Sequence, residues 1–263
     1  MTNIIEVLLL LSDKEVRESV VITGANGKLG TAITTHLVES GYHIVAVVRP
    51  LHGREDVIVR SEGLVTEVAL DLVQEGSAII LCEKLVALSI SPIGLINNAR
   101  DLKNLGLDET GLVSRKNFQN EHLLGVVVPY EISSAFADKF NTLRSIINIS
   151  SMYGNVAVNK TLYEENGQNS PIHYGVSKAG LNHLTRELAV RFAEKKISVN
   201  SISFGGVAGR ADQNFVNKYN SLCPSGSMLQ EENVGHHVAY LLDKNLAGLT
   251  GHDLKADGGW TIW

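Results

Sequence analysis

The stretch V-V-I-T-G-A-N-G-K-L-G, residues Val20–Gly30, decides the fold of this chain. The β-branched residues at its start predict a short buried strand. Leu29, Ile33 and Leu37 then recur at the spacing of one helix face, so a helix follows a tight turn. The first turn of a helix leaves backbone N–H groups unpaired and carries partial positive charge. This strand, turn and helix therefore predict a binding site for a pyrophosphate.

The glycines of the turn suit such a site. Gly24 permits the sharp turn, Gly27 lets the backbone approach the phosphates, and Gly30 lets the helix pack close to the sheet. A rival interpretation is the phosphate loop of nucleoside triphosphate-binding proteins, because a glycine–lysine pair also ends that motif. It would require a glycine where Ile22 stands and a serine or threonine where Leu29 stands. The dinucleotide interpretation is therefore favoured.

Length and composition are those of a globular protein with a sizeable core. The chain has 263 residues, of which 44% are hydrophobic and 19% charged, and nothing in it forces a division into two domains. The net charge of −5 and the absence of a basic block argue against nucleic acid as the main partner. No histidine or cysteine spacing matches a metal site, so no metal is expected.

The two cysteines, Cys82 and Cys223, are isolated and are interpreted as reduced thiols, which indicates the cytoplasm. The apolar run Ile4–Leu11 lacks a basic start and a cleavage site and is too short to span a bilayer. We expect it to pack on the domain as a helix or strand, or to form an oligomer contact.

Strands alternate with helices along the rest of the chain. Six further strands are predicted, at Tyr42–Val48, Val65–Leu70, Ile93–Ile96, Arg144–Ile149, Ile197–Ser203 and His252–Ala256. Helices are expected around residues 78–89, over Lys116–Lys139 with a kink or break at Pro129, over His173–Lys195 and over Glu231–Leu242. This order predicts an α/β, doubly wound Rossmann fold. It consists of a parallel sheet of about seven strands with helices on both faces, and ligands bind at the carboxyl ends of the strands.

Tyr174 and Lys178 lie four residues apart in a predicted helix, so both side chains project from one face. A free tyrosine, with a pKa of about 10, is a poor acid or base near neutrality. A nearby ammonium favours the phenolate and moves that pKa towards the range of efficient proton transfer. The same spacing also arises by chance, so its meaning depends on the surrounding motifs.

Those motifs occur in a characteristic order. They are T-G-A-N-G-K-L-G, N-N-A-R, S-S-M-Y-G, Y-G-V-S-K, N-S-I-S-F-G-G-V and T-G-H-D-L-K-A-D-G-G-W. Together they resemble the short-chain dehydrogenase/reductase family over nearly the whole chain. The resemblance implies one Rossmann-fold oxidoreductase domain over residues 19–263, preceded by an extension at residues 1–18. It also implies a homo-oligomer, a dimer or a tetramer.

The resemblance implies hydride transfer between a nicotinamide cofactor and an alcohol or carbonyl. By position, Tyr174 is the proton donor in reduction, and Lys178 assists it and contacts the nicotinamide ribose. Ser151 would hydrogen-bond the substrate oxygen, for which Ser150 is the weaker candidate. The implied cofactor-binding residues are Gly24, Asn26, Gly27, Lys28, Leu29, Gly30, Arg49, Asp71, Leu72, Asn98, Ala99, Lys178, Gly206 and Val207.

Arg49, at the end of the second predicted strand, bears on the choice of cofactor. An acidic residue there would hold the ribose 2′-hydroxyl of NAD, whereas an arginine favours a 2′-phosphate. Lys28 adds positive charge near the phosphates, so NADP(H) is preferred and NAD(H) stays possible. The alternative is that Arg49 is a solvated charge at a strand end.

Several positions depart from the family pattern. Arg100 replaces the usual glycine after N-N-A, and Phe204 replaces the usual proline. His122 stands where the family usually has the asparagine of a water-linked proton relay. Either His122 holds that water, or a shift in register gives the role to Asn120.

The 23 positions from Ser151 to Tyr174 exceed the usual spacing and create the polar loop Tyr153–Ser170. This insert loosely resembles a bacterial subgroup of sugar-modifying oxidoreductases linked to flagellin nonulosonate biosynthesis of the legionaminic-acid type. The substrate is then a small polar carbonyl or alcohol, including sugar derivatives. Polar loop residues could bind its hydroxyls, or the loop could be plain solvated surface: Asn155, Asn159, Glu164, Glu165 and Asn166.

Two other functions stay open. A nucleotide-sugar epimerase or dehydratase normally has a sizeable C-terminal substrate domain, for which the segment after Phe204 is short. A dinucleotide-binding regulator without turnover would explain the departures from the family pattern. It would not explain an intact set of Ser151, Tyr174 and Lys178, because a sensor has no need of a tuned phenol.

Overall fold

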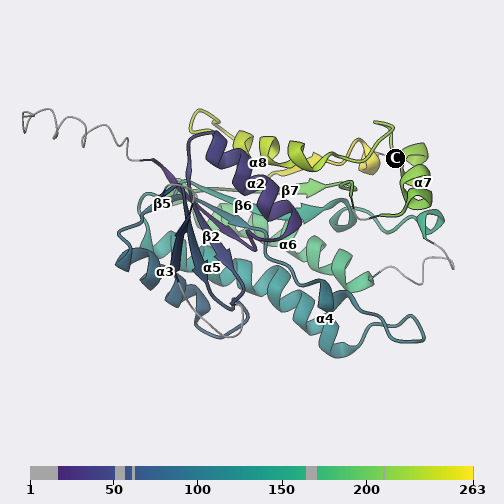
Figure 1. Ribbon diagram of the computed structural model, residues 1–263, viewed down its shortest axis with the longest axis horizontal. Helices are drawn as coiled ribbons and strands as arrows, with labels where there is room; N and C mark the ends of the chain where they lie inside the picture. The colour runs from purple at the N-terminus through teal and green to yellow at the C-terminus, as the bar shows by residue number, and fades with distance from the viewer. Residues whose placement is uncertain (1–16, 51–56, 61–62, 164–170, 210, 263) are drawn as a thin grey trace, which may run out of the picture.

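A central eight-stranded sheet organises the protein (Figure 1). The computed structural model describes residues 17–50, 57–60, 63–163, 171–209 and 211–262, and residues 57–60 by their backbone alone. The strands are β1 Ser19–Thr23, β2 His43–Val48, β3 Val57–Arg60, β4 Val65–Ala69, β5 Pro92–Asn97, β6 Ser145–Ser151, β7 Ser198–Phe204 and β8 Asp253–Ala256. Their spatial order is β3-β4-β2-β1-β5-β6-β7-β8.

Seven of these strands run parallel, as the apolar stretches predict. The antiparallel edge strand β3 was not predicted. Because β1 lies between β2 and β5, the strand order reverses at β1, and the carboxyl end of β1 opens into the glycine turn. The apolar run Ile4–Leu11 lies outside the described residues.

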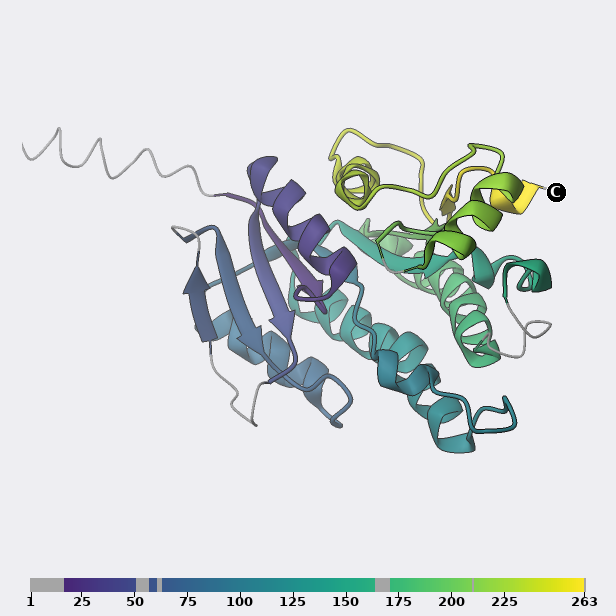
Figure 2. The ribbon, with the colours of Figure 1, turned by 45° about the vertical axis from the view of Figure 1, so that its right-hand side comes forward.

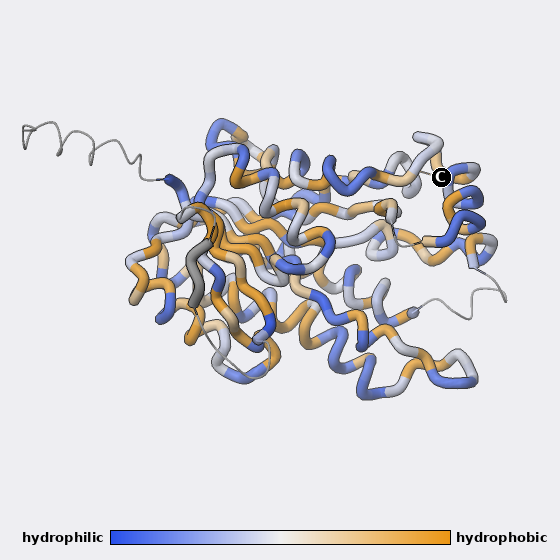
Figure 3. Tube along the Cα trace, in the orientation of Figure 1, coloured by the Kyte–Doolittle hydropathy of each residue, from blue (hydrophilic) through white to orange (hydrophobic). Residues whose placement is uncertain are grey.

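Helices cover both faces of the sheet, which confirms the predicted doubly wound fold (Figures 1 and 2). One face carries α2 (Lys28–Glu39) and α8 (Val234–Leu242), and the other carries α3 (Ser77–Ala87), α5 (Val128–Lys139) and α6 (Ile172–Arg191). Each face has its own apolar core. Figure 3 shows the hydrophobic residues gathered in the strands and the inner sides of the helices. Two shorter helices, α4 (Arg115–His122) and α7 (Gln213–Leu222), flank the carboxyl ends of the strands.

The predicted long helix over Lys116–Lys139 is one helical rod with a π-helical turn at Leu123–Val127. Pro129 lacks an N–H group, and its ring would clash with the carbonyl four residues earlier in an ordinary α-helix. The wider π turn accommodates it directly ahead of α5. The rod therefore continues without a break and brings its middle turn against α6.

None of the helices in the described part of the chain is both long enough and apolar enough to cross a membrane. Cys82 and Cys223 are buried free thiols, as the sequence indicated. Burial raises the pKa of the Cys82 thiol to about 11.

The glycine turn between β1 and α2 has the geometry that its sequence predicts. Gly24 has a φ of +65°, and a side chain there would place its Cβ 2.7 Å from Ala99 Cα. A Cβ on Gly30 would collide with the carbonyl oxygen of Gly24 and lie 2.7 Å from Ala25 Cα. The helix start thus packs directly on the turn, and only glycine permits this approach.

Replacing Gly30 by alanine is expected to destabilise the fold by about 3 kcal/mol, the upper end of the cost of overpacking. Helix propensity alone would give the opposite sign, because alanine is favoured over glycine inside a helix by about 1 kcal/mol. Urea unfolding measures the change. Thr35→Ala, at an exposed position of the same helix, is the matched control. Equal midpoints for the two variants would contradict the predicted clash.

Candidate active site and cofactor cleft

The carboxyl ends of β1 and β5 are tied together by hydrogen bonds. The hydroxyl of Thr23 accepts the backbone N–H groups of Asn98 and Ala99, at 3.0 and 3.1 Å. The side-chain amide of Asn98 donates to the carbonyls of Thr23 and Gly24, each at 3.0 Å. Asn98 therefore holds the glycine turn in place and has little donor capacity left for a ligand.

A cleft of about 750 Å³ lies beside this junction. Six of the predicted cofactor-binding residues line it, namely Gly24, Asn26, Arg49, Asp71, Leu72 and Ala99. Gly27 caps the start of α2, and no side chain forms a cap hydrogen bond there. A helix N-terminus without a side-chain cap, next to glycines that a Cβ would clash with, fits a bound pyrophosphate.

Lys28 is oriented differently from the prediction. Its ammonium donates to the carbonyl of Ala208 and lies 3.6 Å from a carboxylate oxygen of Glu231. It thereby links the start of α2 to the segment after β7. The charge predicted near the phosphates is shared with an acidic partner, so Lys28 is a weaker argument for NADP(H) than the sequence suggested.

Arg49 has a partner as well. Its guanidinium Nη2 lies 3.0 Å from Asp101 Oδ2, and its side chain is 53% exposed. Both residues line the cleft, so this ion pair links the end of β2 to the segment after β5. Arg49 is thus an exposed residue just after β2 that is paired with one carboxylate, so the alternative of a solvated strand-end charge stays open.

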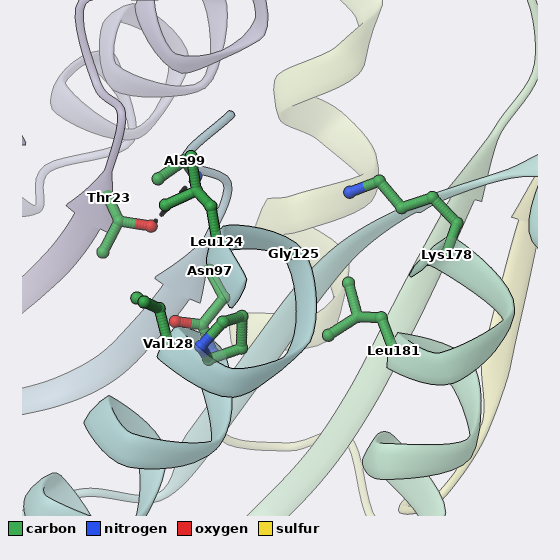
Figure 4. Close-up of a pocket in the computed structure, with 9 residues that line it drawn as sticks. Thr23, Asn97, Ala99, Leu124, Gly125, Val128, Lys178 and Leu181 are labelled. Carbon is green, nitrogen blue, oxygen red and sulfur yellow. Dashed lines mark hydrogen bonds between the residues drawn. The ribbon is translucent and has the colours of Figure 1, made fainter. Parts of the chain in front are cut away.

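The predicted pair Tyr174 and Lys178 lies on one face of α6. The Nζ of Lys178 is 5.8 Å from the centre of the Tyr174 ring. Lys178 is only 7% exposed, and its ammonium donates to the Ile149 carbonyl of β6 at 2.7 Å. Figure 4 shows this side chain extending from α6 towards Ala99.

Burial lowers the pKa of Lys178 to about 8, the nearby charge of Arg100 adds to this effect, and Glu121 opposes it. The Glu121 side chain is itself buried on α4, and burial raises its pKa against the opposing charges of Arg100 and Lys178. The two shifts have the same origin, because taking either charge out of water is costly. The site thus contains a buried cation whose charge is only partly compensated.

Ser151 ends β6 and is 6% exposed. Its hydroxyl oxygen accepts the N–H of Tyr153 at 3.2 Å, which starts the short turn Met152–Gly154. This turn packs tightly on α6, since a Cβ on Gly154 would lie 2.9 Å from the carbonyl carbon of Lys178. The other candidate, Ser150, is directed away and donates to the Lys178 carbonyl at 3.4 Å.

Arg100 was not predicted as a site residue, although its departure from the family's glycine was the signal that could have found it. Its guanidinium carbon lies 4.2 Å above the centre of the Tyr174 ring. Tyr174 faces a second cavity of about 640 Å³, and Arg100 lines both this cavity and the cofactor cleft. The two cavities therefore meet at Arg100.

The two relay candidates lie in different surroundings. The side chain of His122 is exposed and lies beside Gly180 of α6. Helical geometry turns its neighbours inward instead, so that Asn120 lines the cofactor cleft and Glu121 is buried. Of the two alternatives, only Asn120 lies in the cleft.

At the end of β7, the backbone N–H of Gly206 donates to the hydroxyl of Tyr219 at 2.8 Å. Tyr219 is buried and stacks on Trp260, with ring centres 4.6 Å apart. Sequence reasoning missed Tyr219, because nothing local marks its contact with residues 13 positions earlier. Val207 forms a single β-bridge with Leu229. The segment of Gly206 and Val207 is therefore in contact with both Tyr219 and Leu229.

In the polar loop after Ser151, two of the predicted polar side chains form hydrogen bonds within the protein. The amide of Asn155 donates to Ser203 and Asp253, and Asn159 accepts the N–H of Thr161. These contacts stabilise the loop itself, and Asn155 also lines the cavity in front of Tyr174. Glu164, Glu165 and Asn166 lie outside the described residues. No group of potential metal ligands occurs among the residues that the structure describes.

Comparison with known proteins gives concordant results. A family model described as enoyl-(acyl carrier protein) reductase matches residues 24–261. The post-translational flagellin modification protein A of Campylobacter coli is 33% identical over 143 residues, which are 54% of this chain and 56% of that protein. The chain thus spans little more than half the length of this relative.

Two further relatives align over almost their whole length. The 3-oxoacyl-[acyl-carrier-protein] reductase FabG of Buchnera aphidicola is 27% identical, with coverage of 92% of this chain and 97% of that protein. The ribulose-forming D-arabinitol 2-dehydrogenase of Candida tropicalis is also 27% identical, with coverage of 93% and 92%.

Among solved structures, a short-chain dehydrogenase from Leptospira borgpetersenii with bound NAD+ has a TM-score of 0.82 at 22% identity, with 96% of each chain covered. This likeness concerns the fold. The family match covers nearly the whole chain and agrees with the ordered motifs at the strand ends. The chain therefore belongs to the short-chain dehydrogenase/reductase family of NAD(P)-dependent oxidoreductases.

Proposed function

We propose that this oxidoreductase acts on a small polar carbonyl or alcohol, with Tyr174, Lys178 and Ser151 carrying the proton chemistry. The observation that supports this most directly is the buried ammonium of Lys178, 5.8 Å from the centre of the Tyr174 ring, on the helix that presents Tyr174 to the second cavity. A buried cation next to a phenol has an evident use in proton transfer, and it is costly to maintain without one.

Each residue has a definite task in this proposal. The bound dinucleotide supplies or accepts the hydride. In reduction, Tyr174 gives its hydroxyl proton to the substrate oxygen, and the charge of Lys178 stabilises the phenolate that remains. The oxygen of Ser151 accepts the Tyr153 N–H, which leaves its own proton to donate to the substrate oxygen as negative charge develops there. Asn120, rather than His122, takes the relay position in the cleft.

The glycine turn would hold the pyrophosphate at the start of α2, through the backbone of residues 24–30. Asp71 and Leu72 line the half of the cleft that suits the adenosine. Ala99 and Lys178 lie towards the nicotinamide half, and Gly206 and Val207 would border it from the end of β7. Asn98 contributes by fixing the turn.

We infer a preference for NADP(H) from Arg49, which lines the adenosine half of the cleft. A guanidinium can bind a 2′-phosphate through two hydrogen bonds. Asp101 competes with that phosphate for the same guanidinium. Because the ion pair is exposed, it is weak, and a dianionic phosphate would displace the carboxylate.

The proposed substrate class is a sugar derivative or related polyol. The second cavity offers Tyr153, Tyr163 and Lys160 as polar groups, and the hydroxyls of Tyr153 and Tyr163 lie 2.9 Å apart. The two relatives that align over almost their whole length are named for different substrates, so the comparison does not decide between substrate classes. The polar groups of the cavity can hydrogen-bond the hydroxyls of a sugar derivative or polyol, and the apolar side chains that share the lining, such as Val156 and Ile172, can pack against its carbon skeleton.

Two rivals have less support. The regulator hypothesis gains from the unusual Arg100, but it gives no reason for burying Lys178. The epimerase or dehydratase hypothesis lacks a second domain among the described residues, whose strands all belong to one sheet.

We also propose that the chain forms a homo-oligomer and works in the cytoplasm. The first point rests on exposed apolar side chains outside the two cavities, Tyr130 of α5 and Val190 of α6. The second rests on the two buried free thiols, which suit a reducing compartment.

Tyr174→Phe is expected to lower kcat by about 10² to 10⁴, because the proton donor is lost while the ring and its packing remain. The affinity for NADPH, measured by fluorescence titration, should stay within about a factor of two. Tyr240→Phe, at an exposed position of α8, is the control. Undiminished turnover in Tyr174→Phe would refute the proposed role.

Lys178 should make stability depend on pH. Its pKa is lowered from 10.5 to about 8 in the folded protein. The folded state therefore disfavours the protonated amine, and stability is highest above 10.5 and is lost as the pH falls towards 8. Lys178→Met removes this titration. We expect the thermal stability of the wild type to rise relative to Lys178→Met between pH 7 and pH 10. Parallel pH curves would show that the amine is not buried as described.

Arg49→Ala is expected to lower kcat/KM for NADPH relative to NADH by about tenfold or more, the cost of one charge-assisted contact. Asp101→Asn should shift the ratio the other way, by about threefold, since it frees Arg49 from an exposed ion pair. Steady-state kinetics with both cofactors test both variants. An unchanged ratio in Arg49→Ala would remove the basis for the NADP(H) preference.

A further inference from the structure

The cavity in front of Tyr174 has an unusual electrostatic character. Its described lining includes two cations, Arg100 and Lys160, and no carboxylate. Of the acidic residues that the structure describes near this cavity, Asp101 pairs with Arg49 and Glu121 is 3% exposed on α4. In the part of the chain that the structure describes, Arg100 forms no ion pair within 4.0 Å.

Among the described residues, Arg100 stacks on Tyr174 and makes no side-chain hydrogen bond. The guanidinium carbon lies 4.2 Å from the centre of the Tyr174 ring, so the π face of that ring stabilises the cation. An arginine held against an aromatic face still presents the N–H groups along its edge, in the fork that matches a carboxylate or a phosphate. The residue is exposed to solvent and lines the cavity, so a ligand can reach it.

We propose that Arg100 forms an anion subsite beside the catalytic tyrosine, and that the substrate is a carbonyl compound or alcohol carrying a carboxylate or phosphate group. This inference rests on the proposed function of Tyr174. Lys160, from the short helical turn Lys160–Leu162, adds a second positive charge to the same cavity. The substrate oxygen is placed at Tyr174 while the anionic group binds Arg100.

The charges around the site support this assignment. Arg100 and Lys178 are both cations near Tyr174, and the pKa of Lys178 is lowered first by burial and then by the charge of Arg100. Glu121 offsets only part of this charge, because burial raises its pKa. A bound anion would supply the missing countercharge at the moment of reaction. The glycine that the family usually has after N-N-A would provide no such contact.

The test compares matched substrates at low ionic strength, in the presence of NADPH and of NADH. D-fructose, D-fructose 6-phosphate and 5-keto-D-gluconate offer a ketone without charge, with a phosphate and with a carboxylate. We expect the wild type to favour one of the charged ketones over fructose by at least tenfold in kcat/KM, which also identifies the anion. Added salt should reduce this preference.

Arg100→Gly, the residue usual in the family, should reduce the preference for the charged ketone by at least tenfold. Arg100→Lys should retain part of it, because a lysine keeps the charge without the fork. Lys160→Ala should have a smaller effect of the same sign. Lys116→Ala, which removes an exposed charge from α4, controls for the net charge of the protein and should leave the preference unchanged.

Calorimetric titration of each ketone into the wild type and Arg100→Gly, with cofactor bound, gives a readout that needs no turnover. Tighter binding of the charged ketone that disappears in Arg100→Gly supports the subsite even if the reaction is slow. Equal kcat/KM for charged and neutral ketones, or a preference that survives Arg100→Gly, overturns the subsite and leaves the proposed function standing. Binding without turnover of any ketone or alcohol contradicts the proposed function instead.

Discussion

The contact between the glycine turn and the end of β5 is the constraint on which the rest of the site depends. Gly24 comes so close to Ala99 that no side chain fits between them, and Asn98 fastens the approach with two hydrogen bonds to the turn. This contact sets the width of the cofactor cleft at the point where the strand order reverses. It also fixes the path of the chain after β5, and with it the backbone position of Arg100. The glycine turn and the start of the segment that carries Arg100 are thus positioned by one backbone junction.

A second constraint comes from the tight packing of α6 on the end of β6 and on the π turn of the neighbouring helix. Glycines permit this approach at Gly154 and Gly125, where a Cβ would meet Lys178 and Ser177. The close packing removes water from Lys178 and directs its ammonium to the Ile149 carbonyl. Burial then changes the chemistry of the amine, because an ion without water must be stabilised by its neighbours. The same helix faces the outer cavity with Tyr174, so a single element separates the dry interior around Lys178 from that cavity.

The sequence predicted much of this arrangement, for identifiable reasons. Continuous apolar stretches identify parallel strands buried on both faces, so seven strands were found. Pro129 was correctly recognised as incompatible with a plain α-helix, but the π turn that absorbs it depends on packing against α6. The short strand β3 was missed because its pairing with β4 is a tertiary contact. Lys28 and His122 were assigned by motif position alone, and the structure orients the first towards Glu231 and the second towards solvent.

By itself, the sequence determined the order of strands and helices, the glycine turn and the spacing of Tyr174 and Lys178, since each follows from local periodicity and backbone sterics. Only the tertiary structure decided which charges meet. The pairing of Arg49 with Asp101, the burial of Glu121 and the position of Arg100 over Tyr174 join residues from different elements. Electrostatic interactions depend on distance and burial in three dimensions. Chain position specifies neither until the sheet has brought the strand ends together.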